Sequence, residues 1–163
     1  MTRKGVVAQA FGVPDSIRSN ERIAWMAGRK ALQLEAPVYT QRDVRIDDGI
    51  EVEYTPEEPG NPPPTLRIVR GAVAWAIRLG IGELWLACAK PHLWRCKRDL
   101  EYAIREAGVR ITVRVCEYVE RYPEHEWYCA DSTQPRVRSE KEWRRRERII
   151  EWMPMFIYKR VAS

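Results

Sequence analysis

The sequence predicts a single α/β domain over residues 1–163: a three-layer sandwich in which a mainly parallel sheet of about five to six strands carries helices on both faces. Two observations predict this fold class. Short apolar runs of strand length alternate with segments whose apolar residues recur every three or four positions, as strand–helix–strand crossovers require. The chain of 163 residues is 45% hydrophobic, which suffices for one core and is too short for two domains.

Three apolar runs in the first third of the chain are predicted strands: residues 5–11, 38–40 and 50–54. The last of these alternates apolar and acidic residues, as a half-exposed edge strand does. A helix is expected between the first two strands, with Ser16 or Ser19 as its N-cap, and Ala36 before Pro37 ends it.

A proline-rich segment follows the third predicted strand. Residues 55–65 contain five prolines and one glycine, so they cannot form regular structure. We interpret this stiff loop as a flap over a ligand site.

The second half continues the alternation of helix and strand. A helix over 66–79 is expected to have Thr65 as N-cap and Gly80 as C-cap. The elements expected after it are a buried strand from residue 83, a helix from 92 to about 107, a strand over 109–115, a polar loop over 120–137, a charged helix over 139–152 and a last strand over 155–161.

Polar and titratable residues follow several of the predicted strands. Because the carboxyl ends of parallel strands share one edge of a sheet, we expect these residues to line one crevice. The predicted ligand-binding residues are Gly12, Ser16, Asn20, Gln41, Arg42, Asp43, Thr65, Lys90, Arg95 and Glu117. The arginines and the lysine would supply positive charge, and the start of the first helix would receive a phosphate or carboxylate.

His92 is the predicted catalytic residue, because a histidine that follows a strand can titrate near neutrality. In this hypothesis Asp43 or Glu117 orients its ring. Two plainer interpretations stay open: His92 as a helix-initial residue bonded to a backbone carbonyl, and Arg95 as a surface ion pair. No metal site is predicted, since the only zinc-like pattern is His92 with Cys96 and His125 with Cys129, which nothing in the sequence brings together.

Residues 64–111 resemble the ElyC/SanA/YdcF-like bacterial family, in which a Thr-led helix and an apolar strand precede an H-x-x-R segment that opens the next helix. The matching positions are Thr65, His92 and Arg95, and residues 11–31 resemble the family's first loop and helix. The resemblance implies a Rossmann-like fold, and in some members a nucleotide-like methyl-donor cofactor or a role in envelope biogenesis. The chain departs from the family pattern after Thr65 and in the TQRD segment that ends its second strand.

The charge pattern indicates the chemical class of the partner. The net charge is +5, and the basic run over 136–148 interleaves arginines with glutamates, as a solvated helix face does. We therefore expect an anionic small molecule as the partner, and neither nucleic acid nor membrane; a homo-oligomer stays open. The start of the chain lacks the apolar core of a signal peptide, so we expect a cytoplasmic protein with reduced cysteines.

The leading hypothesis is a protein that binds a phosphorylated or nucleotide-like ligand at the carboxyl edge of its sheet, with transferase or hydrolase activity left open. The alternative is a non-catalytic interaction protein that holds a protein or RNA partner through the proline-rich flap or the basic C-terminal helix. The sequence names neither a cofactor nor a reaction.

Overall fold

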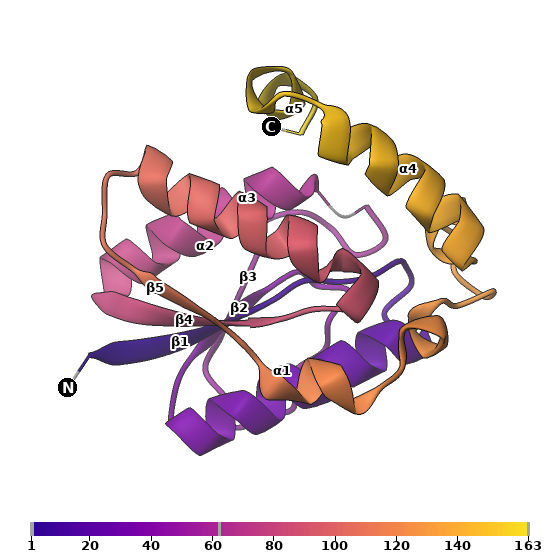
Figure 1. Ribbon diagram of the computed structural model, residues 1–163. Helices are drawn as coiled ribbons and strands as arrows, with labels where there is room; N and C mark the ends of the chain where they lie inside the picture. Colours follow the sequence, from indigo (N-terminus) through magenta and orange to yellow (C-terminus); the bar gives the residue numbers. More distant parts are fainter. Residues whose placement is uncertain (1, 62, 163) are drawn as a thin grey trace.

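Five parallel strands form one sheet at the centre of the molecule (Figure 1). The computed structural model describes residues 2–61 and 63–162. In spatial order the strands are β3 (Val52–Tyr54), β2 (Val38–Thr40), β1 (Arg3–Ala8), β4 (Ile81–Ala87) and β5 (Thr112–Val115). Every neighbouring pair is parallel. The predicted α/β fold class with a mainly parallel sheet is confirmed, and the predicted edge strand is β3.

Helices cover both faces of the sheet. Helix α1 (Arg18–Leu34) lies on one face, and α2 (Thr65–Leu79) and α3 (Leu93–Glu106) lie on the other (Figure 1). The central strand β1 supplies both cores, because its side chains alternate between the two faces: Val6 packs in the α1 core and Val7 in the α2–α3 core.

Two of the predicted helix caps are wrong. Helix α1 has Ile17 at its N-cap and no side-chain cap; Ser16 is exposed, and the Ser19 hydroxyl donates instead to the Phe11 carbonyl at 2.8 Å. Pro64 holds the N-cap position of α2, so Thr65 is its first residue. The predicted C-cap Gly80 is confirmed, with a left-handed φ of 65° that suits glycine.

The C-terminal region holds two helices, and the predicted last strand is wrong. Helix α4 (Glu140–Trp152) begins after Ser139, whose side chain accepts from the Glu142 amide. The segment expected as a strand is helix α5 (Met155–Val161). Pro154 starts this helix, because its carbonyl accepts from two amides in the first turn, and only Tyr158 of the seven residues is fully buried. Both helices lie outside the sheet and its covering layers (Figure 1).

The polar segment predicted as a loop contains short 3-10 turns: η2 (Glu117–Arg121), η3 (Glu124–Trp127) and η4 (Pro135–Val137). It is anchored in the core, since Trp127 and Val137 are buried. The Thr133 amide also donates to the Val13 carbonyl at 2.9 Å, which ties this segment to the turn after β1.

The strand order creates one switch point. The chain runs from β1 outward to β2 and β3, and then returns through α2 to β4 on the other side of β1. Connections that leave β1 and β4 therefore diverge to opposite halves of the sheet, and a crevice is expected beyond the carboxyl ends of these two strands. No helix in the described part of the chain is long and apolar enough to cross a membrane.

Candidate functional site

A pocket of about 430 Å³ lies beyond the carboxyl ends of β1 and β4, at the switch point of the sheet. Its size is that of an ordinary small-molecule site. Residues 9–12 after β1, Gln41 after β2, and His92 with Arg95 after β4 line it from the sheet side. Side chains of α4 and α5 line the opposite side. The pocket therefore depends on both the α/β body and the C-terminal helices.

His92 is the most constrained polar side chain of the pocket. It begins the turn into α3 and is only 6% exposed. Its Nε2 lies 2.9 Å from Arg95 Nη2, 3.2 Å from Arg95 Nε and 3.3 Å from Thr65 Oγ1. The ring packs edge-on against Trp143 with a centroid separation of 5.2 Å. The Arg95 bonds follow from helical spacing, because a residue three positions later lies on the same face of the helix.

These contacts set the protonation state of His92. Burial lowers its pKa well below the ordinary value, and the nearby Arg95, Arg146 and Arg136 guanidiniums lower it further, so the imidazole is neutral at neutral pH. A guanidinium has no acceptor, so Nε2 must be the nitrogen that accepts. The proton then sits on Nδ1, a buried atom with no hydrogen-bond partner among the described residues.

Three arginines line the pocket, and none of its described lining residues is acidic. Arg95 is buried and pairs with the Glu147 carboxylate at 3.0 Å. Burial lowers the pKa of Arg146 to about 10, with repulsion from Arg95 and Arg136 as the next causes. The pKa of Arg136 is lowered for the same two reasons, burial first and Arg95 second. The guanidiniums that line the pocket therefore repel one another.

Glu147, on α4, offsets part of the positive charge of these arginines. Burial raises the pKa of its carboxyl, and the Arg95 and Arg146 guanidiniums oppose that rise. With one carboxylate against three guanidiniums, the group carries a net charge of +2. The residual charge faces the pocket, which can receive an anion there.

The structure brings five of the predicted site residues to this pocket: Gly12, Gln41, Thr65, His92 and Arg95. Gln41 Oε1 accepts from the Ala10 amide at 2.8 Å and so fixes the backbone after β1. Gly12 has a φ of 98°, and a Cβ there would come within 2.7 Å of the Ser132 and Val137 side chains. That close approach packs the η4 segment, which carries Arg136, against the turn after β1.

The other predicted residues lie outside the pocket lining: Ser16, Asn20, Arg42, Asp43, Lys90 and Glu117. Asn20 is structural, because its side chain bonds the Phe11 amide and the Gly12 carbonyl. Lys90 pairs with Glu120 at 2.5 Å, and Glu117 pairs with Lys30 at 2.6 Å.

The expectation that Asp43 or Glu117 orients His92 is also corrected. Asp43 accepts instead from the Gly60 amide at 2.8 Å, which holds the proline-rich segment, and Arg42 is exposed beside the Tyr54 ring. Arg95 and Thr65 are the residues that hold the imidazole.

Sequence reasoning misses Arg136, Arg146 and Trp143, because the run that contains them has the charge pattern of a solvated helix face. The sequence holds one signal that Arg146 faces inward. Trp143, Arg146 and Ile150 recur at intervals of three and four, which places Arg146 on the apolar stripe of α4. The Trp143 indole donates to the Pro91 carbonyl at 3.1 Å and packs on Phe11, which docks α4 beside His92.

Metal ligation finds no support in residues 2–61 and 63–162, where no group of three or more His, Cys, Asp or Glu side chains is placed to hold an ion. All four cysteines are buried and free.

No protein-family model matches the chain, and no curated protein matches it. Among solved structures, a universal stress protein from Archaeoglobus fulgidus in complex with dAMP is similar, with a TM-score of 0.37 and 15% sequence identity. The similarity covers 72% of this chain and 100% of that one. At this level of similarity, the ligand of that protein carries no information about the ligand of this chain.

Proposed function

We propose that this protein binds a phosphorylated small molecule in the pocket at the carboxyl edge of its sheet. The observation that supports the proposal is the convergence of Arg95, Arg136 and Arg146 on one pocket whose described lining has no acidic side chain. Desolvating like charges is costly, and a protein retains such a cluster where a ligand neutralises it.

A phosphate monoester matches the site in charge and in hydrogen bonding. Its dianion balances the net charge of +2 left by the three guanidiniums and Glu147. Guanidinium groups bond phosphate oxygens in a bidentate manner. Two further buried donors have no partner among the described residues, His92 Nδ1 and Gln9 Nε2, and both residues line the pocket. The site thus offers donors, as a group rich in acceptor oxygens requires.

In this proposal His92 is a neutral hydrogen-bond donor. A general acid must carry a transferable proton near neutral pH, and burial and the arginines lower the pKa of His92 too far for an imidazolium. The Nε2 lone pair is also engaged by Arg95. A transferase or hydrolase reaction with His92 as acid or base, membership in the ElyC/SanA/YdcF-like family and a methyl-donor cofactor stay predictions.

The test is calorimetric titration with inorganic phosphate and methyl phosphate at low ionic strength. We expect Arg136→Gln and Arg146→Met each to weaken binding at least about tenfold, since each removes a charge-assisted contact. Arg145→Met is the matched control, because Arg145 neighbours Arg146 on α4, is exposed and lies outside the pocket lining. Absence of phosphate binding by the wild type, or equal affinity in all four proteins, would overturn the proposal.

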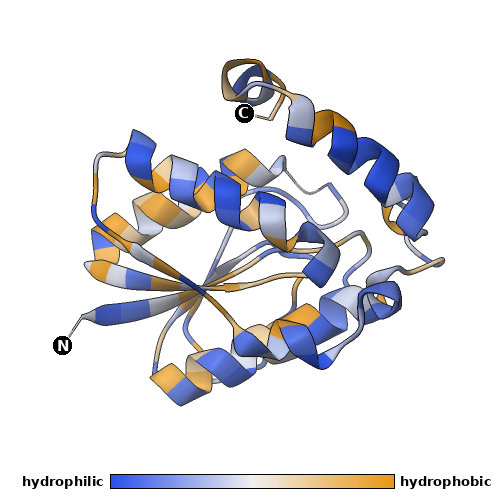
Figure 2. Cartoon of the chain, viewed as in Figure 1, coloured by the Kyte–Doolittle hydropathy of each residue, from blue (hydrophilic) through white to orange (hydrophobic). Residues whose placement is uncertain are grey.

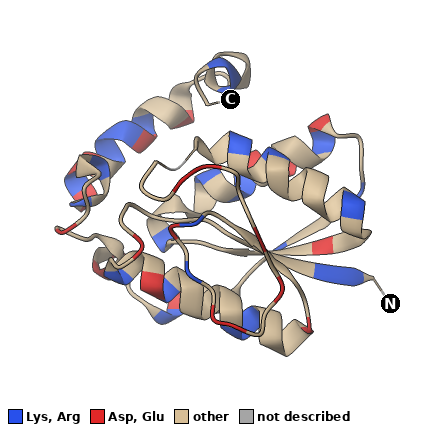
Figure 3. Ribbon diagram, turned by 180° about the vertical axis from the view of Figure 1, so that it is seen from behind, with Lys and Arg blue, Asp and Glu red and all other residues tan. Residues whose placement is uncertain are grey.

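The alternative of a protein or RNA partner on the basic helix has weaker support. Acidic residues interleave with basic ones along α4 (Figure 3). Arg144, at the centre of the run, pairs with Glu140 at 2.7 Å and with Glu124 at 3.4 Å. Part of the positive charge on this face is therefore offset within the molecule.

A further inference from the structure

The outer side of the C-terminal helices carries an apolar groove that the proposed function does not use. Large apolar side chains are exposed there, and Trp152 is 87% exposed. The groove is shallow and open to solvent, and is lined by Arg148, Ile149, Trp152, Met153 and Ile157. Figure 2 shows the C-terminal half of α4 as more apolar than its basic first half. Exposed apolar surface of this kind marks a binding site for an apolar group.

The groove adjoins the pocket. Ile149 and Met153 line both. On α4, Arg146 lies one turn before Ile149 and Ile149 lies one turn before Trp152, so these side chains are neighbours on the helix surface, and Met153 follows directly after the last residue of the helix. A single extended molecule can therefore contact the Arg146 guanidinium with one end and the groove with the other.

The rest of the pocket favours an aliphatic chain over a nucleoside. Several side-chain polar groups that line it are already engaged within the protein: Gln41 Oε1 accepts from Ala10, and the Tyr158 hydroxyl donates to Asp99 at 2.5 Å. Two fully buried side-chain atoms of the lining have no partner among the described residues, His92 Nδ1 and Gln9 Nε2, and both are donors. They suit an acceptor-rich phosphate and supply none of the acceptors that a ribose and a base also need, whereas an alkyl chain needs none.

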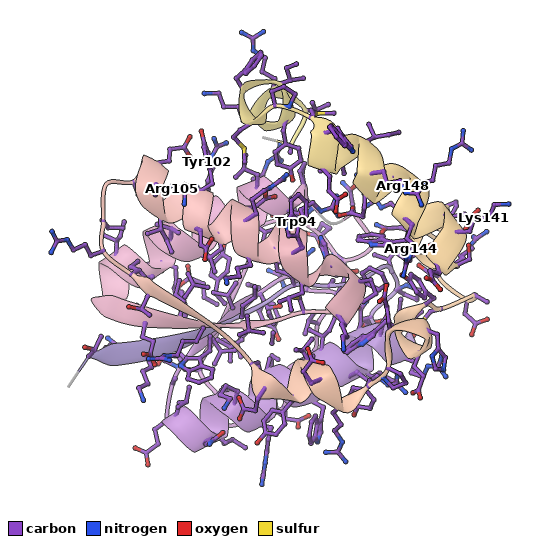
Figure 4. All side chains as sticks on the ribbon, viewed as in Figure 1. Trp94, Tyr102, Arg105, Lys141, Arg144 and Arg148 are labelled. Atoms are coloured by element: carbon purple, nitrogen blue, oxygen red, sulfur yellow. The ribbon has the colours of Figure 1, made fainter. Side chains whose placement is uncertain are left out.

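We propose that the ligand is a phosphate monoester of an aliphatic chain, with its phosphate on Arg95, Arg136 and Arg146 and its chain leaving over Ile149 and Met153 into the apolar groove. The proposal rests on the proposed function and adds the chemical class of the ligand. Arg148 projects from α4 (Figure 4) and adds a positive charge to the lining of the groove.

The test is calorimetric titration with monomeric alkyl phosphates from methyl to octyl. Each methylene that leaves water is expected to tighten binding about two- to fourfold, where fourfold corresponds to about 0.8 kcal/mol for full burial and the open groove gives less. Adenosine monophosphate is the competing ligand class, and we expect it to bind no more tightly than methyl phosphate.

Substitutions in the groove test where the alkyl chain of the ligand binds. Trp152→Ser is expected to reduce the gain per methylene while leaving the affinity for methyl phosphate unchanged, because Trp152 lines the groove and lies outside the lining of the phosphate pocket. Ile149→Ser is expected to reduce the gain per methylene as well. Leu32→Ser on α1 is the matched control, since Leu32 and Ile149 are both 62% exposed and Leu32 lies outside both cavities. The control should keep the full dependence on chain length.

The titrations distinguish failure of the aliphatic-chain proposal from failure of the proposed phosphate binding. If methyl phosphate binds through Arg136 but affinity does not rise with chain length, or adenosine monophosphate binds more tightly than octyl phosphate, the aliphatic chain is refuted and phosphate binding stands. If no phosphate ester binds, both fail.

Vesicles with and without phosphatidic acid identify the source of the ester. Binding to phosphatidic acid vesicles that needs both Arg136 and Ile149 supports the inference with a lipid as the source, and binding of monomers alone supports it with a free amphiphile. Vesicle binding that needs Trp152 and is indifferent to Arg136 would overturn it in favour of membrane docking. Self-association in sedimentation velocity that Trp152→Ser abolishes would overturn it in favour of a second copy on the groove.

Discussion

Replacing Arg146 by methionine is predicted to stabilise the unliganded protein while it removes phosphate binding. Arg146 sits on the apolar stripe of α4 with its charge facing Arg95 and Arg136. Methionine keeps most of the aliphatic stem that packs there and removes the charge. Opposite effects on stability and binding are expected only if the arginines are held together for a ligand.

The magnitude follows from the pKa. A fall from the ordinary arginine value to about 10 means that the folded protein disfavours the charged form by about 3 kcal/mol. Arg146 is half-buried, so solvent screening, together with the guanidinium packing that methionine does not replace, reduces the expected gain to about 1–2 kcal/mol. Because the unfolded chain binds the proton more tightly, the penalty is fully present below pH 10 and is relieved as the pH rises above it.

The assay is urea denaturation in a phosphate-free buffer between pH 6 and 9. We expect a constant gain over this range for Arg146→Met, and a change within about 0.5 kcal/mol for the exposed Arg145→Met. Adding methyl phosphate should stabilise the wild type and the Arg145 variant but not the Arg146 variant. A loss of about 1 kcal/mol or more for Arg146→Met without ligand would refute the reasoning, because the guanidinium would then stabilise the fold.

Two further predictions concern the packing around the site. Tyr158→Phe should lower the free energy of unfolding by about 1–3 kcal/mol, because it removes the hydroxyl that donates to the fully buried Asp99. Burial raises the pKa of Asp99, and the hydrogen bond from Tyr158 opposes that rise. The loss measured by urea denaturation should therefore shrink at acid pH, where Asp99 is protonated. Gly71→Ala should lower the thermal midpoint, because a Cβ there would overlap the Tyr39 hydroxyl. Gly28→Ala in α1, where the nearest atom to an added Cβ is 3.6 Å away, should be neutral or stabilise the protein by up to about 1 kcal/mol. Equal effects of the two substitutions would contradict the close packing of Tyr39 on Gly71.

The sheet and one side of the pocket could be predicted from the sequence, because both depend on local patterns. The alternation of strand and helix implies parallel strands whose carboxyl ends share an edge, and that edge is where Gln41, His92 and Arg95 lie. Lys90 and Glu117 follow strands in the same way. They pair with Glu120 and Lys30, which lie outside the pocket lining, and sequence spacing does not reveal such pairings.

The other side of the pocket could not be predicted, because it depends on tertiary docking. Arg146 reaches the site because Trp143 bonds Pro91 and Tyr158 bonds Asp99, contacts between residues 52 and 59 positions apart. Arg136 reaches it because η4 packs against the turn after β1. The misassigned strand over 155–161 has the same origin. A short apolar run fits a strand or a helix equally, and here Pro154 starts a helix that buries Tyr158.

A crystal structure of the protein with octyl phosphate bound tests the central claim most directly. We expect the phosphate oxygens within hydrogen-bonding distance of the Arg136 and Arg146 guanidiniums, and the alkyl chain against Ile149 and Met153. Phosphate density at the start of α1, beside Ser16 and Asn20 and away from all three arginines, would contradict it.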